Sequence, residues 1–429
     1  MRNRFQDISN SGYGKVAGNF LYLSILNALN VLLPLITLPY ILKTVGKANY
    51  GIYSYVYTVV GYVIMFATYG FNYTATKQIS QCRDDRNKVN EIFNSVIASK
   101  FLIGLLMTLV IFIVQRFVFR DDLAPLMFIF GLGLIFGDVF TPVWLFQGME
   151  QMKYVTIVNA TSKILFTLLV FIVIRKAEDY YLLIGLNSLG YVVAGILSMI
   201  LARRQFGMKL GVSTFAGVKY QLKAGGAVFG STLGMYLYRN ANVIILKQFA
   251  SNDIVGIYSA AEKVVKGFQS LVSPAAQALF PHLSLKFKSR EDKDNLATLK
   301  KIAIPFSAVV LVISIGVYLF APLISDILCG KDFRDCVPLI RIMTLVILFG
   351  EINYLIGIVG LINLDRQKQF FRAVVITGLF SVAFIVIFAR QYGAYAAAAS
   401  MSLSEMLLTI LCVSSLYKII RKRNEKTGS

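Results

Sequence analysis

The sequence predicts an all-α polytopic membrane protein, with about twelve transmembrane helices in two six-helix bundles around a central cationic cavity. Three observations support this fold class: an apolar composition, apolar windows of membrane-spanning length along the whole chain, and an internal repeat. Of the 429 residues, 57% are hydrophobic and 15% are charged, and the mean hydropathy is +0.67. Such values are not those of a soluble globular protein.

The apolar windows approach the ~20 residues that a helix needs to cross the hydrocarbon core. They cover residues 17–41, 50–71, 92–114, 123–147, 154–174, 181–202, 222–247, 253–281, 302–328, 337–362, 372–390 and 393–417. The first window lacks a small-residue cleavage site and is longer than the core of a signal peptide, so we expect it to remain in the protein as a helix.

The net charge of +21 raises the question of a nucleic-acid partner. The basic residues, however, concentrate in the segments that twelve spans place on one side of the membrane, chiefly 203–223, 286–301 and 418–426. By the positive-inside rule this side is the cytoplasm, which holds both termini. These segments are typical of cytoplasmic anchors beside anionic lipid, and we expect no nucleic-acid partner.

Three short sequences recur in the same order in both halves of the chain. They are GIYS at 51–54 and 256–259, FIVI at 171–174 and 384–387, and LIFGD at 134–138 echoed by ILFGE at 347–351. We therefore predict two domains, residues 1–210 and 211–429, each a six-helix bundle. Because six is even, both bundles have the same orientation, and a binding site is expected between them near the midplane.

The window 253–281 carries Glu262, Lys263 and Lys266 within five residues. At about 100° per residue, these side chains and Gln269 fall on one third of the helix, and the rest of its surface is apolar. A polar stripe of this kind indicates a helix that lines a water-filled cavity. The alternative is an internal ion pair between Glu262 and Lys266, which are four residues apart, but that pair leaves Lys263 unexplained.

The preceding window carries Arg239 beside Tyr236 and Asn242, with no acidic residue in the same segment. Counted from the outer loop, Arg239 and Lys263 reach similar depths in the membrane. Two unpaired cations at one depth favour an anionic ligand, and all the residues named for these two helices are candidate ligand contacts. The alternative is that acids from other helices satisfy the cations.

Further polar residues in the N-terminal half are candidates for the same cavity. Asn27 and Asn30 share one face of the first helix, where they line the cavity or make hydrogen bonds to other helices. Lys100 and Lys163 either face the cavity or extend toward the cytoplasmic end of their helices.

Three acidic residues lie deep in predicted spans. Asp138 and Glu351 occupy matching places in the two halves, and Glu405 is in the last span. Each is a candidate for coupling to H⁺ or Na⁺, or a partner of Lys100 or Lys163, and we favour the role of partner. We expect no cofactor other than such a coupling ion.

The inventory of reactive residues argues against an enzyme. His282 is the only histidine, so a histidine-built metal site or catalytic triad is excluded, and no GxxxxGK[ST] motif for ATP is present. Asp292, Lys293 and Asp294 have the DxD spacing of some sugar transferases, but a solvated run of charges explains them better. Cys329 and Cys336 flank an outer loop and are able to pair in an oxidising compartment, although unpaired thiols are the interpretation that we favour.

The chain resembles the polysaccharide or O-antigen flippase family, within the larger group that contains the lipid II flippases and the multidrug and toxin extruders. The resemblance is carried by LPLITLPY at 33–40, VGK at 45–47, YGIYS at 50–54, YGF at 69–71, PVWLFQGMEQMK at 142–153 and VGIYS at 255–259. Asn242 departs from the family, in which an acidic residue often stands near this place, and this puts cation coupling through that helix in doubt.

The resemblance implies that the protein transfers an undecaprenyl-pyrophosphate-linked oligosaccharide from the inner to the outer leaflet of the bacterial plasma membrane, by alternating access, for surface polysaccharide biosynthesis. It also implies a polysaccharide polymerase and chain-length machinery as partners. One rival, an exporter of cationic drugs, predicts carboxylates instead of lysines on the polar stripe. A second, a membrane glycosyltransferase or polymerase, requires a catalytic carboxylate group and a sizeable loop domain.

Overall fold

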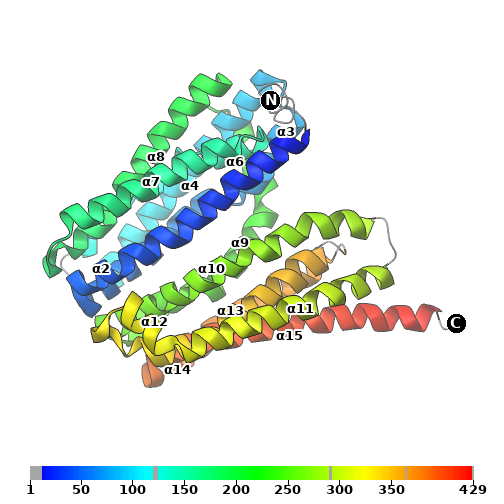
Figure 1. Cartoon of the computed structure of the whole chain (residues 1–429). Coiled ribbons are helices and arrows are strands. Elements are labelled where there is room, and N and C mark those ends of the chain that lie inside the picture. The colour runs from blue at the N-terminus through cyan, green and yellow to red at the C-terminus, as the bar shows by residue number, and fades with distance from the viewer. Residues whose placement is uncertain (1–11, 119–123, 289–291, 363, 365, 428–429) are drawn as a thin grey trace, which may run out of the picture. The chain divides into compact units, whose positions relative to one another are not determined.

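A computed structural model describes residues 12–118, 124–288, 292–362, 364 and 366–427. The described residues form helices and short connections without a strand, which confirms the all-α prediction (Figure 1). The elements in order are α2 (Gly12–Thr68), α3 (Phe71–Gln81), α4 (Arg86–Val118), α5 (Ala124–Val139), α6 (Val143–Gly148), α7 (Met152–Val173), the 3₁₀ helix η1 (Ala177–Tyr181), α8 (Leu182–Phe206), α9 (Phe215–Phe249), α10 (Asn252–Lys288), α11 (Asp292–Leu319), α12 (Ala321–Leu328), the 3₁₀ helix η2 (Lys331–Phe333), α13 (Cys336–Asn353), the π-helix η3 (Tyr354–Ile362), α14 (Gln367–Tyr392) and α15 (Ala394–Thr427).

Within the described ranges, nine helical segments are long and apolar enough to cross a membrane. The first of them, Ser24–Gln81, contains two of the predicted spans, because α2 continues through both with a break at Gly46. The φ of Gly46 is 78°, a conformation that a residue with a Cβ rarely adopts. The predicted spans in α9 and α10 are helical but are not among the nine, and α10 carries three charged residues at its centre.

The chain separates into two compact units that are not contiguous in sequence. Unit 1 comprises Met1–Thr37 and Val56–Thr232, and unit 2 comprises Leu38–Tyr55 and Leu233–Ser429. We describe each unit by itself. The division into domains 1–210 and 211–429 stays a prediction.

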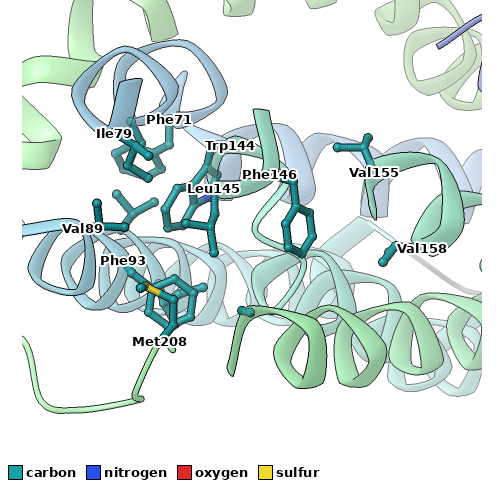
Figure 2. Packing of buried hydrophobic residues seen from close by; sticks show 14 of the residues in the cluster. Phe71, Ile79, Val89, Phe93, Trp144, Leu145, Phe146, Val155, Val158 and Met208 are labelled. Carbon is teal, nitrogen blue, oxygen red and sulfur yellow. The ribbon is translucent and has the colours of Figure 1, made fainter. Parts of the chain in front are cut away.

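The core of unit 1 contains the segment PVWLFQG, which is one of those that carry the family resemblance. Trp144 and Phe146 of α6 are fully buried, together with Phe71 of α3 and Phe93 of α4 (Figure 2). The Phe93 and Trp144 rings pack with their centroids 5.9 Å apart. This segment therefore joins helices α3, α4 and α7 through a common core, and its aromatic residues serve packing.

Unit 2 brings the two GIYS sequences into contact. Gly51 of α2 and Gly256 of α10 face each other so closely that a Cβ on either would overlap the backbone of the opposite helix, at Asn252 and Lys47 respectively. Glycine is required here because the two backbones approach too closely for a side chain to fit between them.

The remaining helices of unit 2 pack around α13. Helices α10, α11 and α15 each lie beside α13, and α14 lies beside α15 (Figure 1). The four cysteines of the chain are free thiols, so Cys329 and Cys336 are not joined. Because α10, α13, α15 and the part of α9 from Leu233 onward belong to unit 2, their polar side chains can be compared directly.

Candidate functional site

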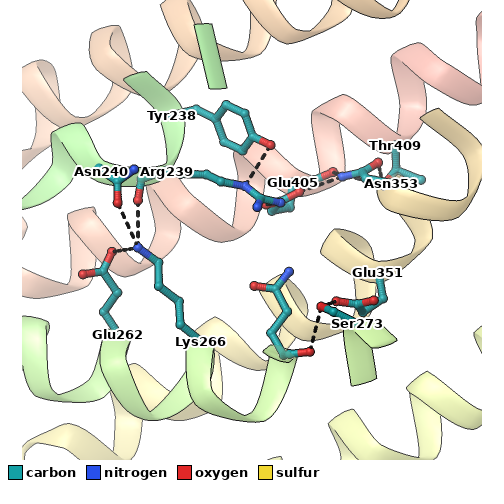
Figure 3. A network of polar contacts seen from close by, with 11 residues as sticks. Tyr238, Arg239, Asn240, Glu262, Lys266, Ser273, Glu351, Asn353, Glu405 and Thr409 are labelled. Carbon is teal, nitrogen blue, oxygen red and sulfur yellow. Dashed lines mark hydrogen bonds and ion pairs between the residues drawn. The ribbon is translucent and has the colours of Figure 1, made fainter. Parts of the chain in front are cut away.

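Polar side chains from α9, α10, α13 and α15 form a network of contacts in unit 2 (Figure 3). It contains Arg239 and Lys266, which were predicted to bind a ligand, and Glu351 and Glu405, which were candidates for ion coupling or, as we favoured, for pairing with a lysine. Residues that are directly hydrogen-bonded in this network lie up to 166 positions apart in the sequence. Packing of distant helices therefore creates this site.

Arg239 is already paired with an acidic residue. Its Nη2 donates to Oε1 of Glu405 at 3.1 Å, and its Nε donates to the hydroxyl oxygen of Tyr238 at 3.0 Å. The expectation of an unpaired Arg239 is therefore wrong, because a carboxylate from the last helix neutralises it at low dielectric. The Arg239 side chain nevertheless remains 41% exposed, so other faces of the guanidinium are accessible to a ligand.

Glu405 is held on both of its carboxylate oxygens. Its side chain is 1% exposed, and Oε2 accepts a hydrogen bond from Nδ2 of Asn353 at 2.8 Å. The Oδ1 of Asn353 in turn accepts from the hydroxyl of Thr409 at 2.7 Å. Asn353 and Thr409 were not predicted. The sequence signal for Asn353 was an amide two residues after Glu351, and the signal for Thr409 was a hydroxyl one helical turn after Glu405.

Lys266 makes three contacts through its ammonium group. Nζ lies 3.0 Å from Oε1 of Glu262 and donates to the Arg239 carbonyl at 3.2 Å and to Oδ1 of Asn240 at 3.3 Å. The ion pair four residues apart, which was left open as an alternative, is thus present. The Lys266 side chain keeps 33% of its surface exposed.

The other candidates on α9 and α10 differ in exposure. Lys263, Gln269 and Tyr236 are partly buried. Asn242 is fully buried and donates to the Ala397 carbonyl at 3.3 Å, so in this conformation it contacts protein. Asn242 also donates to the Tyr258 hydroxyl, 3.4 Å away.

Glu351 has a different environment from Glu405. It is 2% exposed, and its Oε1 lies 2.6 Å from the hydroxyl of Ser273 on α10. Its Oε2 is buried without a hydrogen-bond partner among the described residues. No Lys or Arg in the part of the chain that the structure describes forms an ion pair with it.

Five of the predicted residues lie in unit 1 instead. The Nζ of Lys100 donates to the Asp138 carbonyl at 2.7 Å and to its Oδ2 at 2.9 Å, and the Lys100 side chain is 2% exposed. The structure therefore places Lys100 and Asp138 together as a pair, the role that we favoured for the acid. Lys163 and Asn27 are partly buried, and Oδ1 of Asn30 is buried without a partner among the described residues.

The apolar side of α10 borders a groove. Phe268, Leu271 and Val272 of α10 face Phe306 and Val309 of α11, and the cavity volume is about 550 Å³. Pro305 and Ile313 complete its lining. Pro305 lies inside α11 and removes one backbone hydrogen bond there. Helix α10 therefore carries a polar surface and an apolar groove within a few residues of each other.

The arrangement of cations and acids can bind and neutralise ions. Among the described residues, no group of three His, Cys, Asp or Glu side chains is placed to hold a metal ion. The exposed parts of Arg239 and Lys266 can accept an oxyanion through charge-assisted hydrogen bonds. The buried acids Glu351 and Glu405 set the charge of the surroundings.

Comparison with known proteins gives consistent results. A family model described as polysaccharide biosynthesis protein matches residues 16–287. The "Putative O-antigen transporter" of Escherichia coli (strain K12) is 28% identical over 396 residues, which cover 92% of this chain and 94% of that protein. A protein of the same name from Shigella dysenteriae is 24% identical over 398 residues, with coverage of 93% and 99%.

Solved structures share the fold at low sequence identity. The lipid II flippase MurJ, in an inward closed conformation, aligns with a TM-score of 0.74 and 14% identity over 92% of this chain and 87% of that chain. An inward-facing multidrug resistance MATE family transporter of the MOP superfamily aligns with a TM-score of 0.66 and 12% identity, over 91% and 98%. These likenesses confirm the predicted class of fold.

The family match covers more than half of the chain, and both curated relatives are named as transporters and not as enzymes. The apolar helices agree with a protein that crosses the membrane several times. This chain therefore belongs to the polysaccharide biosynthesis protein family, as a multi-pass membrane protein with the fold of the MOP superfamily transporters.

Proposed function

We propose that the protein is a flippase that moves an undecaprenyl-pyrophosphate-linked oligosaccharide from the inner to the outer leaflet of the bacterial plasma membrane by alternating access. The observation that carries this proposal is the guanidinium of Arg239. It stays 41% exposed in the middle of a polar network although Glu405 already neutralises it. An arginine held in place by a buried acid presents its remaining donors in a fixed geometry, which suits a phosphate.

The charges near Arg239 also suit an anionic ligand. Lys263 and Lys266 lie on α10, and Lys266 donates to the Arg239 carbonyl. The nearby carboxylates Glu262 and Glu405 each have a cation partner. A pyrophosphate, which carries about two negative charges, would be attracted by the cations that remain exposed.

The groove between α10 and α11 supports an amphiphilic ligand. A lipid-linked oligosaccharide needs a charged or polar surface for its head group and an apolar surface for its hydrocarbon tail. Lys266 and Phe268, two residues apart on α10, belong to the polar network and to the groove respectively. We therefore place the lipid tail in this groove and the sugars near Gln269, Asn240 and Tyr236.

The remaining parts of the proposal concern the cellular setting. The distribution of basic residues favours cytoplasmic termini in the inner membrane. A polysaccharide polymerase and the chain-length machinery would receive the product on the outer face. Coupling to H⁺ or Na⁺ would supply energy, and the buried acids are the residues able to bind such an ion.

The test is export of surface polysaccharide from cells in which the variant is the sole flippase of the pathway. Arg239→Ala alone leaves Glu405 buried without its cation, so the informative variant is the double Arg239→Gln/Glu405→Gln, which removes both charges together and leaves a polar side chain at each position. We expect this variant and Lys263→Gln each to lower export at least about tenfold. Lys331→Gln, which changes an exposed lysine outside the network, is the control.

Protein level in the membrane is measured in the same cells, so that loss of folding is separated from loss of transport. Normal export by both site variants at normal protein level would refute the proposed site. Efflux of a cationic dye that depends on this protein, with no effect on polysaccharide, would instead favour the drug exporter.

A further inference from the structure

The acids Asp138, Glu262, Glu351 and Glu405 differ in how their charge is balanced. Asp138 has Lys100 at 2.9 Å, Glu262 has Lys266 at 3.0 Å, and Glu405 has Arg239 at 3.1 Å. Glu351 has the Ser273 hydroxyl on one oxygen and no partner on the other, within the described residues. Glu351 is therefore the one of these four acids that has no cation partner in the described part of the chain.

The hydrogen bonds of Ser273 give a second, independent argument. Its Oγ lies 2.6 Å from Oε1 of Glu351 (Figure 3) and 3.1 Å from the Gln269 carbonyl oxygen. The carbonyl oxygen can only accept a hydrogen bond, and so can Oε1 when Glu351 is ionised. A serine hydroxyl has a single proton to donate. If Glu351 is protonated, it donates to Oγ, and Oγ donates to the Gln269 carbonyl, so that both contacts become hydrogen bonds at once.

Burial of an ionised carboxylate without a cation is far more costly than burial of the neutral acid. With the proton on Oε1, Oε2 is an uncharged carbonyl oxygen, which tolerates the lack of a partner better than a carboxylate oxygen does. The hydrogen-bond geometry and the burial thus agree on the same protonation state.

We propose that Glu351 is a proton-binding site and that it binds its proton together with the anionic head group of the cargo. The charged groups close to Glu351 on neighbouring helices are Glu405 of α15, which contacts Asn353 two residues after Glu351, and Arg239 of α9, which pairs with Glu405. An oxyanion bound at Arg239 adds negative charge near Glu351, and nearby negative charge favours the uncharged form of a carboxyl group. By linkage, the proton then strengthens binding of the anion to the same extent.

The first half of this proposal is independent of the proposed function, and the second half rests on it. The first half is tested without any ligand, by infrared spectroscopy of the purified protein in lipid nanodiscs at neutral pH. The difference spectrum between the wild type and Glu351→Gln should contain the carbonyl band of a protonated carboxylic acid. Asp138→Asn is the matched control, because Asp138 has a cation partner, Lys100, at 2.9 Å, and its difference spectrum should lack that band.

A wild-type spectrum in which Glu351 contributes only carboxylate bands would overturn the proton site. This result is independent of transport, so it is distinct from a failure of the proposed function. Thermal unfolding of each variant shows whether the comparison is made on folded protein.

The second half is tested by calorimetry with farnesyl pyrophosphate, which has the same head group and a shorter tail. Titrations in buffers of different ionisation enthalpy give the number of protons bound with the ligand, over about pH 6 to 9. We expect uptake of up to about one proton per ligand in the wild type and none in Glu351→Gln, with binding retained. Proton release, or equal uptake in the variant, would contradict the linkage. If farnesyl pyrophosphate fails to bind the wild type, the proposed function and the linkage fail, and the infrared result still decides the proton site.

Discussion

Asp138 in unit 1 and Glu351 in unit 2 end the two related sequences LIFGD and ILFGE. Both are acids on helices that pack against several others, yet Asp138 contacts a buried lysine and Glu351 contacts a serine. The repeat therefore fixes the position of an acid in each half, while the neighbouring helices decide its charge. In unit 1 the pair Lys100–Asp138 is a structural element, and in unit 2 the acid has no cation partner among the described residues.

We expect the largest effect when the Lys100–Asp138 pair of unit 1 is broken. Lys100→Met removes the cation and leaves Asp138 uncompensated, at a cost of about 3 kcal/mol. Trp144 is the only tryptophan and is buried in unit 1, so its fluorescence reports thermal unfolding of this unit. The double variant Lys100→Met/Asp138→Asn should recover most of the lost stability, and a double variant no more stable than the single one would argue against the pair.

The second effect concerns the GIYS sequences that occur once in each half. Gly256→Ala forces α10 away from α2, because the added Cβ overlaps the Lys47 carbonyl, and we expect a loss of about 2 kcal/mol. Gly316→Ala in α11 is the control, because a Cβ there meets nothing within 4 Å. Chemical denaturation of the two purified variants measures the difference. Equal stability of the two would show that the glycine contact is not needed.

A smaller effect on stability is expected to distinguish Glu351 from Glu405 in unit 2. Glu351→Gln should change stability by less than about 1 kcal/mol, because on our proposal the amide replaces an uncharged acid. Glu405→Gln should cost about 2 kcal/mol, because Arg239 loses its counter-charge while remaining only partly exposed. Thermal unfolding of both variants in the same detergent measures this order. The reverse order would indicate that Glu351 is ionised.

The smallest effect is expected at the edge of the network. Thr409→Val removes the hydroxyl that donates to Asn353 while preserving the shape of the side chain. Hydrogen bonds between helices in membrane proteins contribute about 0.6 kcal/mol on average. We expect a loss of this size in stability and a modest loss of transport, since Asn353 still donates to Glu405. A large loss of transport without a loss of stability would place Thr409 in direct contact with the cargo.

The helices and the polar stripe of α10 were predictable because they depend on local periodicity. Glu262 and Lys266 are also within one turn of each other, so their pairing was an open alternative from the start. The partner of Arg239 was not predictable, because Glu405 lies 166 positions away on another helix. The close contact between Gly51 and Gly256 was not predictable for the same reason, although both residues belong to the GIYS repeat.

The most direct test of the account is a flipping assay in proteoliposomes with two synthetic cargoes. Both carry the same oligosaccharide and the same polyprenyl tail, but one has a pyrophosphate and the other a neutral linker of similar length. If exposed cations of unit 2 recognise the head group, the pyrophosphate cargo should cross at least about tenfold faster, and Arg239→Gln/Glu405→Gln should remove the difference. Equal rates for the two cargoes in the wild type would contradict the account.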